Sequence, residues 1–436
     1  MPCASRTLVA LLPLCLLGPS LSAQTYDLLL KNGHVIDAKN KISGKRDVAI
    51  RDGKIAEVSA EIAASKAAKV VDVAGLYVTP GLVDLHVHVY ASAAKPSSYC
   101  GALSVFPDDH TFRNGVTTAV DAGTSGWKSF EEFKTRVIDK SRTRVLALLN
   151  IVGSGMCGAV EQDTKEMDPQ QAAAMAKKYP QIIVGFKTAH YTGPEWVAVD
   201  AGLAAGRATN LPLMVDFGSF RIERPFETLV LDKLRPGDMY THMYLNAVPM
   251  LDKDNKIRDF MWQARKRGVL FDAGHGAGSF VWWQAAHAMK QGFPPDSIST
   301  DLHASSMNAG MKGMLNVMSK FLAMGMPLDE VILKSTWNPA RQIHREELGN
   351  LSVGAPADVA VIRLTKGDYG FVDINGGRLK GTQLLSSEIT LRDGKVQYDQ
   401  NGLTRTDWDK IGGRYGAQGD GTWDATIGQT VRARKK

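Results

Sequence analysis

The middle of the chain, from about residue 80 to 345, alternates apolar segments of strand length with segments of helical pattern. Eight apolar segments occur, and they begin near Leu82, Val116, Val145, Ile182, Leu211, Asp238, Val269 and Ser297. The helical segments between them include 169–179, 259–267 and 280–291. This alternation favours βα units with a parallel sheet, and eight is the strand number of a closed (β/α)8 barrel. We therefore predict an α/β protein in which residues 80–345 form a TIM-type barrel.

Both ends of the chain show a different pattern, in which short alternating segments meet at Asn-Gly or Asp-Gly pairs. Such pairs occur at Asn32-Gly33 and Asp52-Gly53 near the start, and at Asp393-Gly394 near the end. They are typical of two-residue β-hairpin turns. We therefore predict that residues 24–79 and 346–402 meet as one small β-sandwich domain, with the barrel inserted between them.

The first 23 residues have the pattern of an export signal. Arg6 supplies a positive charge, an apolar segment follows it, and small residues up to Ala23 suit cleavage before Gln24. The apolar segment is too short to span a bilayer. We predict an exported protein, periplasmic or extracellular, with no stable membrane insertion after cleavage. A buried N-terminal helix or an uncleaved anchor is the alternative.

The charge of the chain limits its partners. The 436 residues carry a formal net charge of +7, part of which lies in a short basic stretch at the very end of the predicted tail, 403–436. No basic run elsewhere alternates with aromatic residues, so nucleic-acid binding is not expected. The expected partner is a small-molecule substrate, and a homo-oligomer remains open.

Cleavage of the signal would leave two of the four cysteines, Cys100 and Cys157. Export would permit a disulfide bond between them, but the sequence does not show that they meet. Two separate buried thiols is the interpretation that we slightly favour.

The strongest chemical signal is Pro80-Gly-Leu-Val-Asp-Leu-His-Val-His-Val-Tyr. Alternate side chains of a strand share a face, which would place Asp84, His86, His88 and Tyr90 on one side and the apolar residues on the other. Buried polar groups need partners, and a metal ion is the natural partner of paired imidazoles. The segment therefore predicts a metal site inside the barrel.

Lys187 ends another apolar segment, Ile182-Ile-Val-Gly-Phe-Lys. A buried lysine is costly as a cation, and loss of hydration lowers its pKa and favours the neutral amine. A neutral amine can take up carbon dioxide as a carbamate, whose two oxygens can bridge two cations. The alternative is an ammonium that reaches the barrel rim and pairs with an acid.

Further polar residues stand at the ends of the candidate strands, where barrel enzymes place their catalytic groups. They are Asp216, His242, His275, Asp301 and His303. His190, three residues after Lys187, and Arg221, just beyond the fifth strand, are candidate substrate contacts. For His275 a structural role is the alternative, and for Arg221 an ordinary surface position.

This ensemble resembles the amidohydrolase superfamily from about residue 26 to 400. The family pattern has two histidines on the first strand, a carboxylated lysine on the fourth, histidines on the fifth and sixth, and an aspartate on the eighth. The matching residues are His86, His88, Lys187, His242 and Asp301. The segments Phe271-Asp-Ala-Gly-His-Gly and Ser299-Thr-Asp-Leu-His resemble the branch of dihydroorotase-like deacetylases and N-acyl amino acid amidohydrolases.

One position departs from this pattern, because the fifth-strand histidine is replaced by Asp216. A carboxylate still binds a divalent metal, but it makes the second metal position more anionic. The resemblance implies two divalent ions, with zinc as the expected metal, and a carbamate on Lys187 derived from carbon dioxide. The implied metal ligands are His86, His88, Lys187, Asp216, His242 and Asp301.

The resemblance further implies hydrolysis of an amide C–N bond by a hydroxide between the metals, with Asp301 as general acid and base. The implied substrate is an N-acyl or N-acetyl amino acid, or a cyclic amide. His275, His303, His190 and Arg221 are expected to contact it. The alternatives are an esterase or lactonase on the same binuclear site, a single-metal deaminase, and a non-catalytic binding protein.

Overall fold

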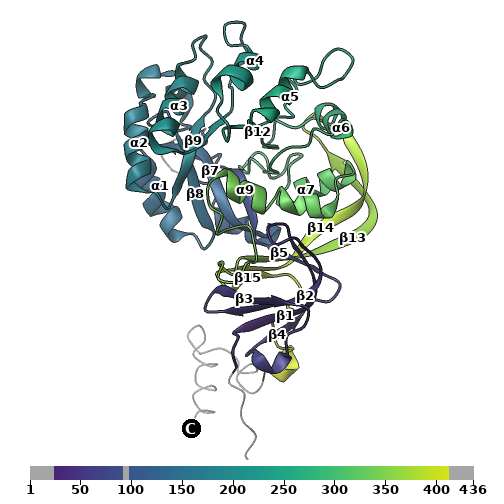
Figure 1. The fold of residues 1–436 in the computed structure, drawn as a ribbon. Coiled ribbons are helices and arrows are strands. Elements are labelled where there is room, and N and C mark those ends of the chain that lie inside the picture. The colour runs from purple at the N-terminus through teal and green to yellow at the C-terminus, as the bar shows by residue number, and fades with distance from the viewer. Residues whose placement is uncertain (1–23, 92–97, 412–436) are drawn as a thin grey trace, which may run out of the picture.

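The computed structural model describes residues 24–91 and 98–411 (Figure 1). The predicted signal, 1–23, and most of the predicted tail, 412–436, lie outside the described residues. The ribbon shows a larger body of helices around parallel strands, and a smaller body of strands beneath it. Within the described part of the chain, no helix is long and apolar enough to cross a membrane.

A curled parallel sheet forms the centre of the larger body. Its seven strands follow one another in chain order, and each pairs in parallel with the next. They are β6 (Leu82–Val87), β7 (Val116–Gly126), β8 (Arg144–Asn150), β9 (Ile183–Thr188), β10 (Leu213–Val215), β11 (Met239–Tyr240) and β12 (Leu270–Phe271). The prediction of seven of the eight strand segments is therefore confirmed.

The eighth predicted strand makes isolated bridges instead of a regular ladder. Ser297 pairs in parallel with Asp272, the residue after β12, and Leu302 pairs in parallel with Val87 in β6. The segment thus contacts both edges of the curled sheet. Asp301 lies in this segment with φ of 51°, in the left-handed region. Extended strands do not use that conformation, which explains why the ladder is interrupted here.

Helices follow the strands and cover the outside of the sheet (Figure 1). They are α1 (Phe130–Arg136), α2 (Pro169–Lys178), α3 (Val197–Thr209), α4 (Phe226–Thr228), α5 (Asp259–Lys266), α6 (Trp282–Lys290), α7 (Met314–Ala323), α8 (Leu328–Leu333) and α9 (Trp337–Gln342). The predicted helical segments correspond to α2, α5 and α6. The start of α2 is fixed locally, because the Asp168 carboxylate accepts hydrogen bonds from the N–H groups of Gln170 and Gln171.

Strands from both ends of the chain form one mixed sheet, in the order β15-β14-β13-β5-β1-β2-β3, with β4 beside β1. The two ends join where β5 pairs in parallel with β1 and antiparallel with β13. The bounds are β1 (Leu28–Asp37), β2 (Ile42–Arg51), β3 (Lys54–Ser59), β4 (Val70–Asp72), β5 (Tyr77–Pro80), β13 (Val359–Val372), β14 (Arg378–Arg392) and β15 (Lys395–Asp399). Strand pairing assigns a single sheet, so the β-sandwich stays a prediction.

Two of the three predicted hairpin turns are confirmed. Asp52-Gly53 joins β2 to β3 and Asp393-Gly394 joins β14 to β15, with φ positive at each of these residues. The prediction for Asn32-Gly33 was wrong, because β1 continues through this pair and its register with β2 shifts there. Asn32 has φ of 66°, and its N–H donates to Asp47 Oδ1 at 2.8 Å. The pair is therefore a bulge and not a turn.

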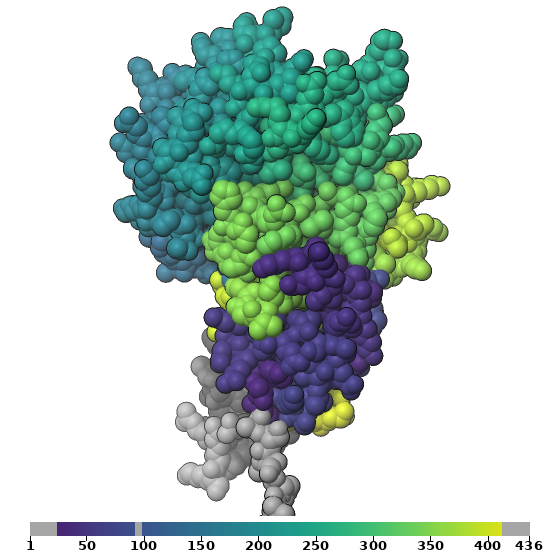
Figure 2. Space-filling view, viewed as in Figure 1, coloured from purple at the N-terminus to yellow at the C-terminus, as the bar shows by residue number. Residues whose placement is uncertain are grey.

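The hairpin of β13 and β14 extends beyond the smaller body and contacts the larger one. In the space-filling view its residues form the yellow-green group on the right edge (Figure 2). Leu385 N in β14 donates to Ser319 Oγ in α7 at 3.0 Å. At the hairpin tip, Asp373 Oδ2 accepts from Trp282 N at the start of α6 at 3.1 Å. The C-terminal segment thus supports the chain that follows β12.

Candidate metal centre

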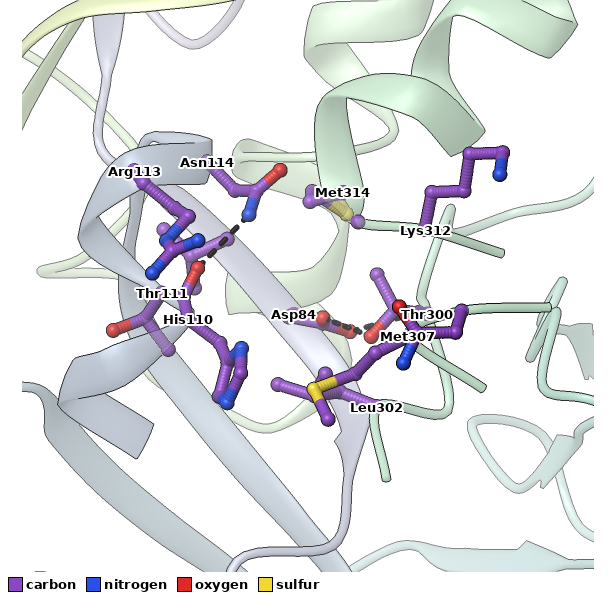
Figure 3. Close-up of a pocket in the computed structure, with 13 residues that line it drawn as sticks. Asp84, His110, Thr111, Arg113, Asn114, Thr300, Leu302, Met307, Lys312 and Met314 are labelled. Carbon is purple, nitrogen blue, oxygen red and sulfur yellow. Dashed lines mark hydrogen bonds between the residues drawn. The ribbon is translucent and has the colours of Figure 1, made fainter. Parts of the chain in front are cut away.

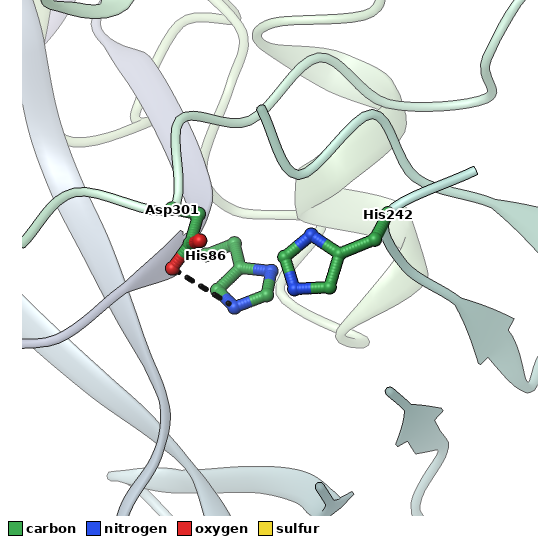
Figure 4. Close-up of side chains that lie close together, drawn as sticks. All are labelled: His86, His242 and Asp301. Atoms are coloured by element: carbon green, nitrogen blue, oxygen red, sulfur yellow. Dashed lines mark ion pairs between the residues drawn. The ribbon is translucent and has the colours of Figure 1, made fainter. Parts of the chain in front are cut away.

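Three side chains from separate strand ends point toward one another (Figure 4). His86 lies in β6, His242 follows β11, and Asp301 lies in the eighth segment. Their ligand-type atoms all lie within 4.8 Å of one another, and all three residues are buried. The carboxyl ends of parallel strands are where barrel enzymes assemble their sites, so sequence and fold agree on this location.

Asp301 has an oxygen that suits a cation. Its Oδ1 lies 3.0 Å from His88 Nε2 and 3.5 Å from His86 Nε2. This oxygen is buried and makes no hydrogen bond within the described part of the chain, which costs free energy. Two ligand atoms each about 2.1 Å from a tetrahedral zinc ion lie about 3.4 Å apart. The separations therefore fit atoms that share one divalent cation.

A hydrogen-bond chain fixes the orientation of His86. Its Nδ1 donates to Thr241 Oγ1 at 2.9 Å, and the Thr241 hydroxyl donates to Asp272 Oδ2 at 2.8 Å. The Nε2 lone pair then faces Asp301. Carboxylates that hold the far nitrogen of an imidazole in this way are common behind metal-ligating histidines.

His88 and His242 are held at the same ring nitrogen. His88 Nδ1 lies 2.8 Å from Thr124 Oγ1. His242 Nδ1 donates to the carbonyl oxygen of Gly274 at 2.6 Å. In both rings Nε2 is directed to a carboxylate of the site, 3.0 Å from Asp301 for His88 and 3.6 Å from Asp216 for His242. Three imidazoles thus present the same nitrogen to one region.

Burial and mutual contact set the protonation states of His86, His88 and Asp301. It lowers the pKa of His88 to about 4 and the pKa of His86 well below its usual value. Burial alone would raise the pKa of Asp301, but the neighbouring His86 and His88 outweigh it and hold that pKa well below the ordinary range. Neutral imidazoles and an ionised carboxylate are the forms that bind metals.

Lys187 in β9 is fully buried, and its Nζ lies 3.3 Å from His86 Nε2. Burial lowers its pKa, although several carboxylates nearby oppose this effect. Gly123 in β7 makes room for it, because a Cβ there would lie 2.6 Å from Lys187 Cγ. The amine of Lys187 therefore lies beside His86, one of the predicted metal ligands.

Asp216 follows β10 and lies between two imidazoles. Its Oδ2 is 3.6 Å from His242 Nε2 and 3.5 Å from His190 Nε2. Burial alone would raise the Asp216 pKa, but the hydrogen bond and charge of His242, together with His190, hold that pKa below its usual value. The carboxylate that replaces the expected histidine is therefore ionised.

The other predicted site residues lie at different distances from the centre. His303 Nε2 is 3.8 Å from Asp301 Oδ2, and its buried Nδ1 has no hydrogen-bond partner in the part of the chain that the structure describes. Arg221 is half-exposed, donates to Thr192 O at 3.1 Å and pairs with Glu223. The structure therefore brings His303 to the cluster, whereas Arg221 contacts Thr192 and Glu223.

His275 is buried behind the cluster. Its Nδ1 donates to Gly276 O at 2.9 Å, and its Nε2 accepts from Lys320 Nζ at 2.6 Å. The ring stacks on Phe280 with 4.4 Å between centroids. Lys320 also donates to carbonyl oxygens of the loop before α7 and of β13. Both ring nitrogens of His275 are therefore engaged by protein groups, as the structural alternative expects.

Sequence reasoning missed Tyr99, whose ring lies over three histidines of the site. The centroid distances are 4.5 Å to His88, 5.2 Å to His303 and 5.7 Å to His190. The residue after it, Cys100, forms a disulfide bond with Cys157. The preference for two separate thiols was therefore wrong, because the fold brings these two loops together. A single sequence carries no signal for this meeting.

Two members of the predicted metal-facing set on the first strand lie elsewhere. Tyr90 follows the end of β6 and packs on Phe133, 5.1 Å between centroids. Asp84 accepts from Thr300 N at 3.0 Å and from Thr300 Oγ1 at 2.5 Å. The register of β6 with β7 shifts between Asp84 and Val87. Strict alternation along this segment was therefore a wrong prediction.

Asp84 and Thr300 border a separate cavity of about 330 Å³ (Figure 3). Its other walls include His110, Arg113 and Lys312. Burial raises the pKa of Asp84 to about 7, because the carboxylate loses hydration. This aspartate ties β6 to the eighth segment instead of joining His86 and His88.

Comparison with known proteins agrees with the observed fold. The Amidohydrolase family matches residues 282–396. A deacetylase of Agrobacterium fabrum is 33% identical over 341 residues, which cover 76% of this chain and 81% of the relative. A solved structure described as an adenine deaminase matches with a TM-score of 0.78 at 28% identity, over 86% of this chain and 100% of that one. One described as a dihydroorotase has a TM-score of 0.74 at 30% identity, over 85% and 98%.

The curled parallel sheet has the fold of the solved structures described as an adenine deaminase and a dihydroorotase. This chain belongs to the amidohydrolase superfamily, in the branch that contains deacetylases, and is an enzyme that hydrolyses carbon–nitrogen bonds. Enzymes of this family use divalent metal ions, and the group of His86, His242 and Asp301 could hold one.

Proposed function

We propose that this enzyme hydrolyses the amide bond of an N-acyl amino acid, with N-acetyl amino acids as the first substrates to test, or opens a cyclic amide. The observation that carries the proposal is the buried Oδ1 of Asp301. It lies within 3.5 Å of two imidazole nitrogens and lacks a hydrogen-bond donor in the described chain. The similarity to a deacetylase supports the amide class.

The proposed ligands divide into two groups around Lys187. His86, His88 and Asp301 would hold one divalent cation, and Asp216 and His242 would hold a second. Lys187, as a carbamate, would bridge them, and its lowered pKa favours the neutral amine that carbon dioxide requires. Bound cations of this kind, with zinc expected, polarise a substrate carbonyl and lower the pKa of water to about 7.

Asp301 is the proposed general base and acid. Because its pKa is held well below the ordinary range, the carboxylate is ionised at neutral pH. It can accept the proton of the attacking water and deliver it to the nitrogen of the leaving amine. The carbonyl carbon gains the water oxygen, the C–N bond breaks, and the amine leaves with the transferred proton.

His303 and Tyr99 are the proposed residues on the substrate side. His303 Nδ1 is a buried polar atom without a partner in the described chain, so a substrate oxygen or N–H group would satisfy it. The ring of Tyr99 lies 5.2 Å from that of His303. Together they give the site one polar and one aromatic surface beside Asp301.

Two further proposals concern the closure of the barrel and the localisation of the enzyme. The eighth segment would close the sheet into a (β/α)8 barrel, and its bridges to Asp272 and Val87 support this. The chain would be exported, and the disulfide bond between Cys100 and Cys157 supports this, because such bonds persist in oxidising compartments.

The test begins with the metal content of the mature protein purified with bicarbonate and zinc. N-Acetyl and other N-acyl amino acids of both hands are then screened beside matched esters and lactones. Metal-dependent turnover of amides supports the proposal. Turnover of esters or lactones alone would replace the amide by the alternative leaving group. Absence of bound metal under several metals would contradict the catalytic proposal and favour a binding protein.

A further inference from the structure

The histidines around the centre differ in which ring nitrogen the protein occupies. In His86, His88 and His242, protein groups occupy Nδ1, and Nε2 faces a carboxylate of the site at 3.0–3.6 Å. This common pattern is the one expected of metal ligands, because an outer partner fixes the tautomer and directs the other nitrogen to the ion.

His190 follows the same pattern. Its Nδ1 donates to Glu161 Oε2 at 2.9 Å, and its Nε2 lies 3.5 Å from Asp216 Oδ2. Glu161 is itself buried, at 4% exposure, and its other oxygen accepts from Gly158 N. A buried carboxylate thus orients this imidazole, as Asp272 acts through Thr241 on His86.

The two remaining histidines near the centre do not share this pattern. His275 Nε2 is occupied by Lys320 at 2.6 Å, so it presents no nitrogen to the site. His303 has no partner for Nδ1 within the described residues. The hydrogen-bond pattern therefore separates His190 from these two and groups it with the proposed ligands.

His190 also shares an unusual backbone conformation with two of the proposed ligands, His242 and Asp301. Its φ is 57°, beside 61° for His242 and 51° for Asp301. Residues other than glycine rarely adopt this left-handed region, and such strained positions cluster at functional sites. His190 and His242 each come two residues after the end of a strand, β9 and β11.

Chain topology explains why His190 meets Asp216. The paired strands β9 and β10 run in parallel with Thr188 opposite Val215. His190 comes two residues after Thr188, and Asp216 comes one residue after Val215. The two side chains therefore leave the same edge of the sheet from neighbouring strands, and Asp216 stands where the family pattern has a histidine.

We propose that His190 supplies the imidazole that the fifth strand lacks, so that the second divalent cation is held by His190, Asp216 and His242. This inference rests on the proposed function. The distances from Asp216 Oδ2 to the two Nε2 atoms, 3.5 and 3.6 Å, match the roughly 3.4 Å expected between ligands of one tetrahedral zinc ion. Each cation position would then have two imidazoles and one carboxylate.

The assignment differs from the substrate contact that the sequence predicted for His190. Compared with the family pattern, the second cation position would keep two imidazoles. One of them, from His190, would come from the end of β9 and not from β10. This ligand change adds a carboxylate without removing a nitrogen, and it makes Glu161 a positioning residue for the second cation.

The experiment compares metal binding by the full-length mature protein and its variants, without reference to activity. His190→Asn removes the imidazole, and Glu161→Gln removes the orienting charge. His34→Asn, at an exposed residue of β1, is the matched control. Zinc per chain is measured after dialysis, and zinc affinity by competition with a chelator. Thermal unfolding and circular dichroism check that each variant is folded.

We expect two zinc ions per chain in the wild type and in His34→Asn, and one in His190→Asn. We expect Glu161→Gln to retain both positions but to weaken the second by on the order of 10- to 100-fold. Cobalt substitution gives a second measurement, because loss of an imidazole ligand alters the absorption bands of the second ion only.

Two ions bound with unchanged affinity by both His190→Asn and Glu161→Gln would overturn the inference and leave the proposed function intact. A wild type that binds one ion would also overturn it, because no second position would exist. A wild type that binds none would instead contradict the proposed function. Should His190→Asn fail to fold, the zinc affinity of Glu161→Gln decides alone.

Discussion

The two sides of the metal centre use the same kinds of side chain in different surroundings. On the first side the side chains of His86, His88 and Asp301 are 1%, 2% and 7% exposed. On the second side those of His242 and Asp216 are 10% and 15% exposed. The first side is more deeply buried, whereas the second contacts Glu161 in the loop after β8. The proposed first cation position is therefore more enclosed than the proposed second one.

The same difference appears in the protonation of the imidazoles. Burial lowers the pKa of His88 to about 4. For His190 burial acts in the same direction, but Glu161 and Asp216 outweigh it and raise the pKa to about 8. At neutral pH the first side is therefore ready to bind a cation, and the second must first release a proton.

The largest effect is expected from Lys187→Ala, which removes the group between the two sides. Both cations should be lost from the dialysed protein, because a shared bridge is missing, and kcat/KM should fall by at least about 10⁴-fold. Metal content and steady-state kinetics measure this, with Lys366→Ala, at an exposed residue of β13, as the control. Full activity with two bound ions would show that the two sides are independent of Lys187.

A smaller effect confined to the first side is expected from Thr124→Val. The change keeps the shape of the side chain and removes the hydroxyl 2.8 Å from His88 Nδ1. Affinity for the first cation should fall by about 10- to 100-fold with the second position unchanged. Chelator competition measures both, and Thr135→Val on the surface of α1 is the control. Equal losses at both positions would remove the distinction between the sides.

The first side was largely predictable from the sequence, and its fold likewise. His86 lies in β6 and His88 directly follows it, while Asp301 lies in the eighth segment, so local pattern and strand order suffice to bring them together. Seven of the eight predicted strand segments and the three predicted helices are confirmed for the same reason, because apolar periodicity reflects burial directly. Asn32-Gly33 failed because a turn-type pair also suits a bulge when an aspartate accepts its N–H.

The second side was less predictable, because its contacts join separate loops. Glu161 and Tyr99 lie in connections without periodicity, and both reach His190 only through the folding of those loops. The disulfide bond between Cys100 and Cys157 was unpredictable for the same reason, because it joins two loops whose cysteines are 57 residues apart. Asp84 was misplaced because the strand is irregular just beyond it. Side-chain pairing across loops depends on tertiary geometry that no single segment encodes.

The pH dependence of metal binding should differ between the two sides. Ligating imidazoles must be neutral, and the His190 pKa of about 8 means that a proton competes with the second cation below pH 8. Its apparent affinity should rise about tenfold per pH unit from pH 6 to 8 and then level off. The affinity of the first position for its cation should stay nearly constant over this range, because the His88 pKa is about 4.

Calorimetric titration at pH 6, 7 and 8 measures the cation affinity of both positions, and His190→Asn should abolish the steep pH dependence of the second. Equal slopes at both positions would contradict the comparison.

The smallest effect is expected from Tyr99→Phe, because the Tyr99 ring contacts His88 on the first side and His190 on the second. The change keeps the ring and removes the hydroxyl, so both cations should remain bound. Loss of one hydrogen bond to substrate should lower kcat/KM by about 2- to 10-fold, while the control Tyr179→Phe should match the wild type. Steady-state kinetics on the best amide substrate measure this.

An unchanged kcat/KM in Tyr99→Phe beside a lowered kcat/KM in Tyr99→Ala would limit the role of Tyr99 to packing of its ring. Loss of metal from Tyr99→Phe would instead make its hydroxyl part of the support that the two sides share.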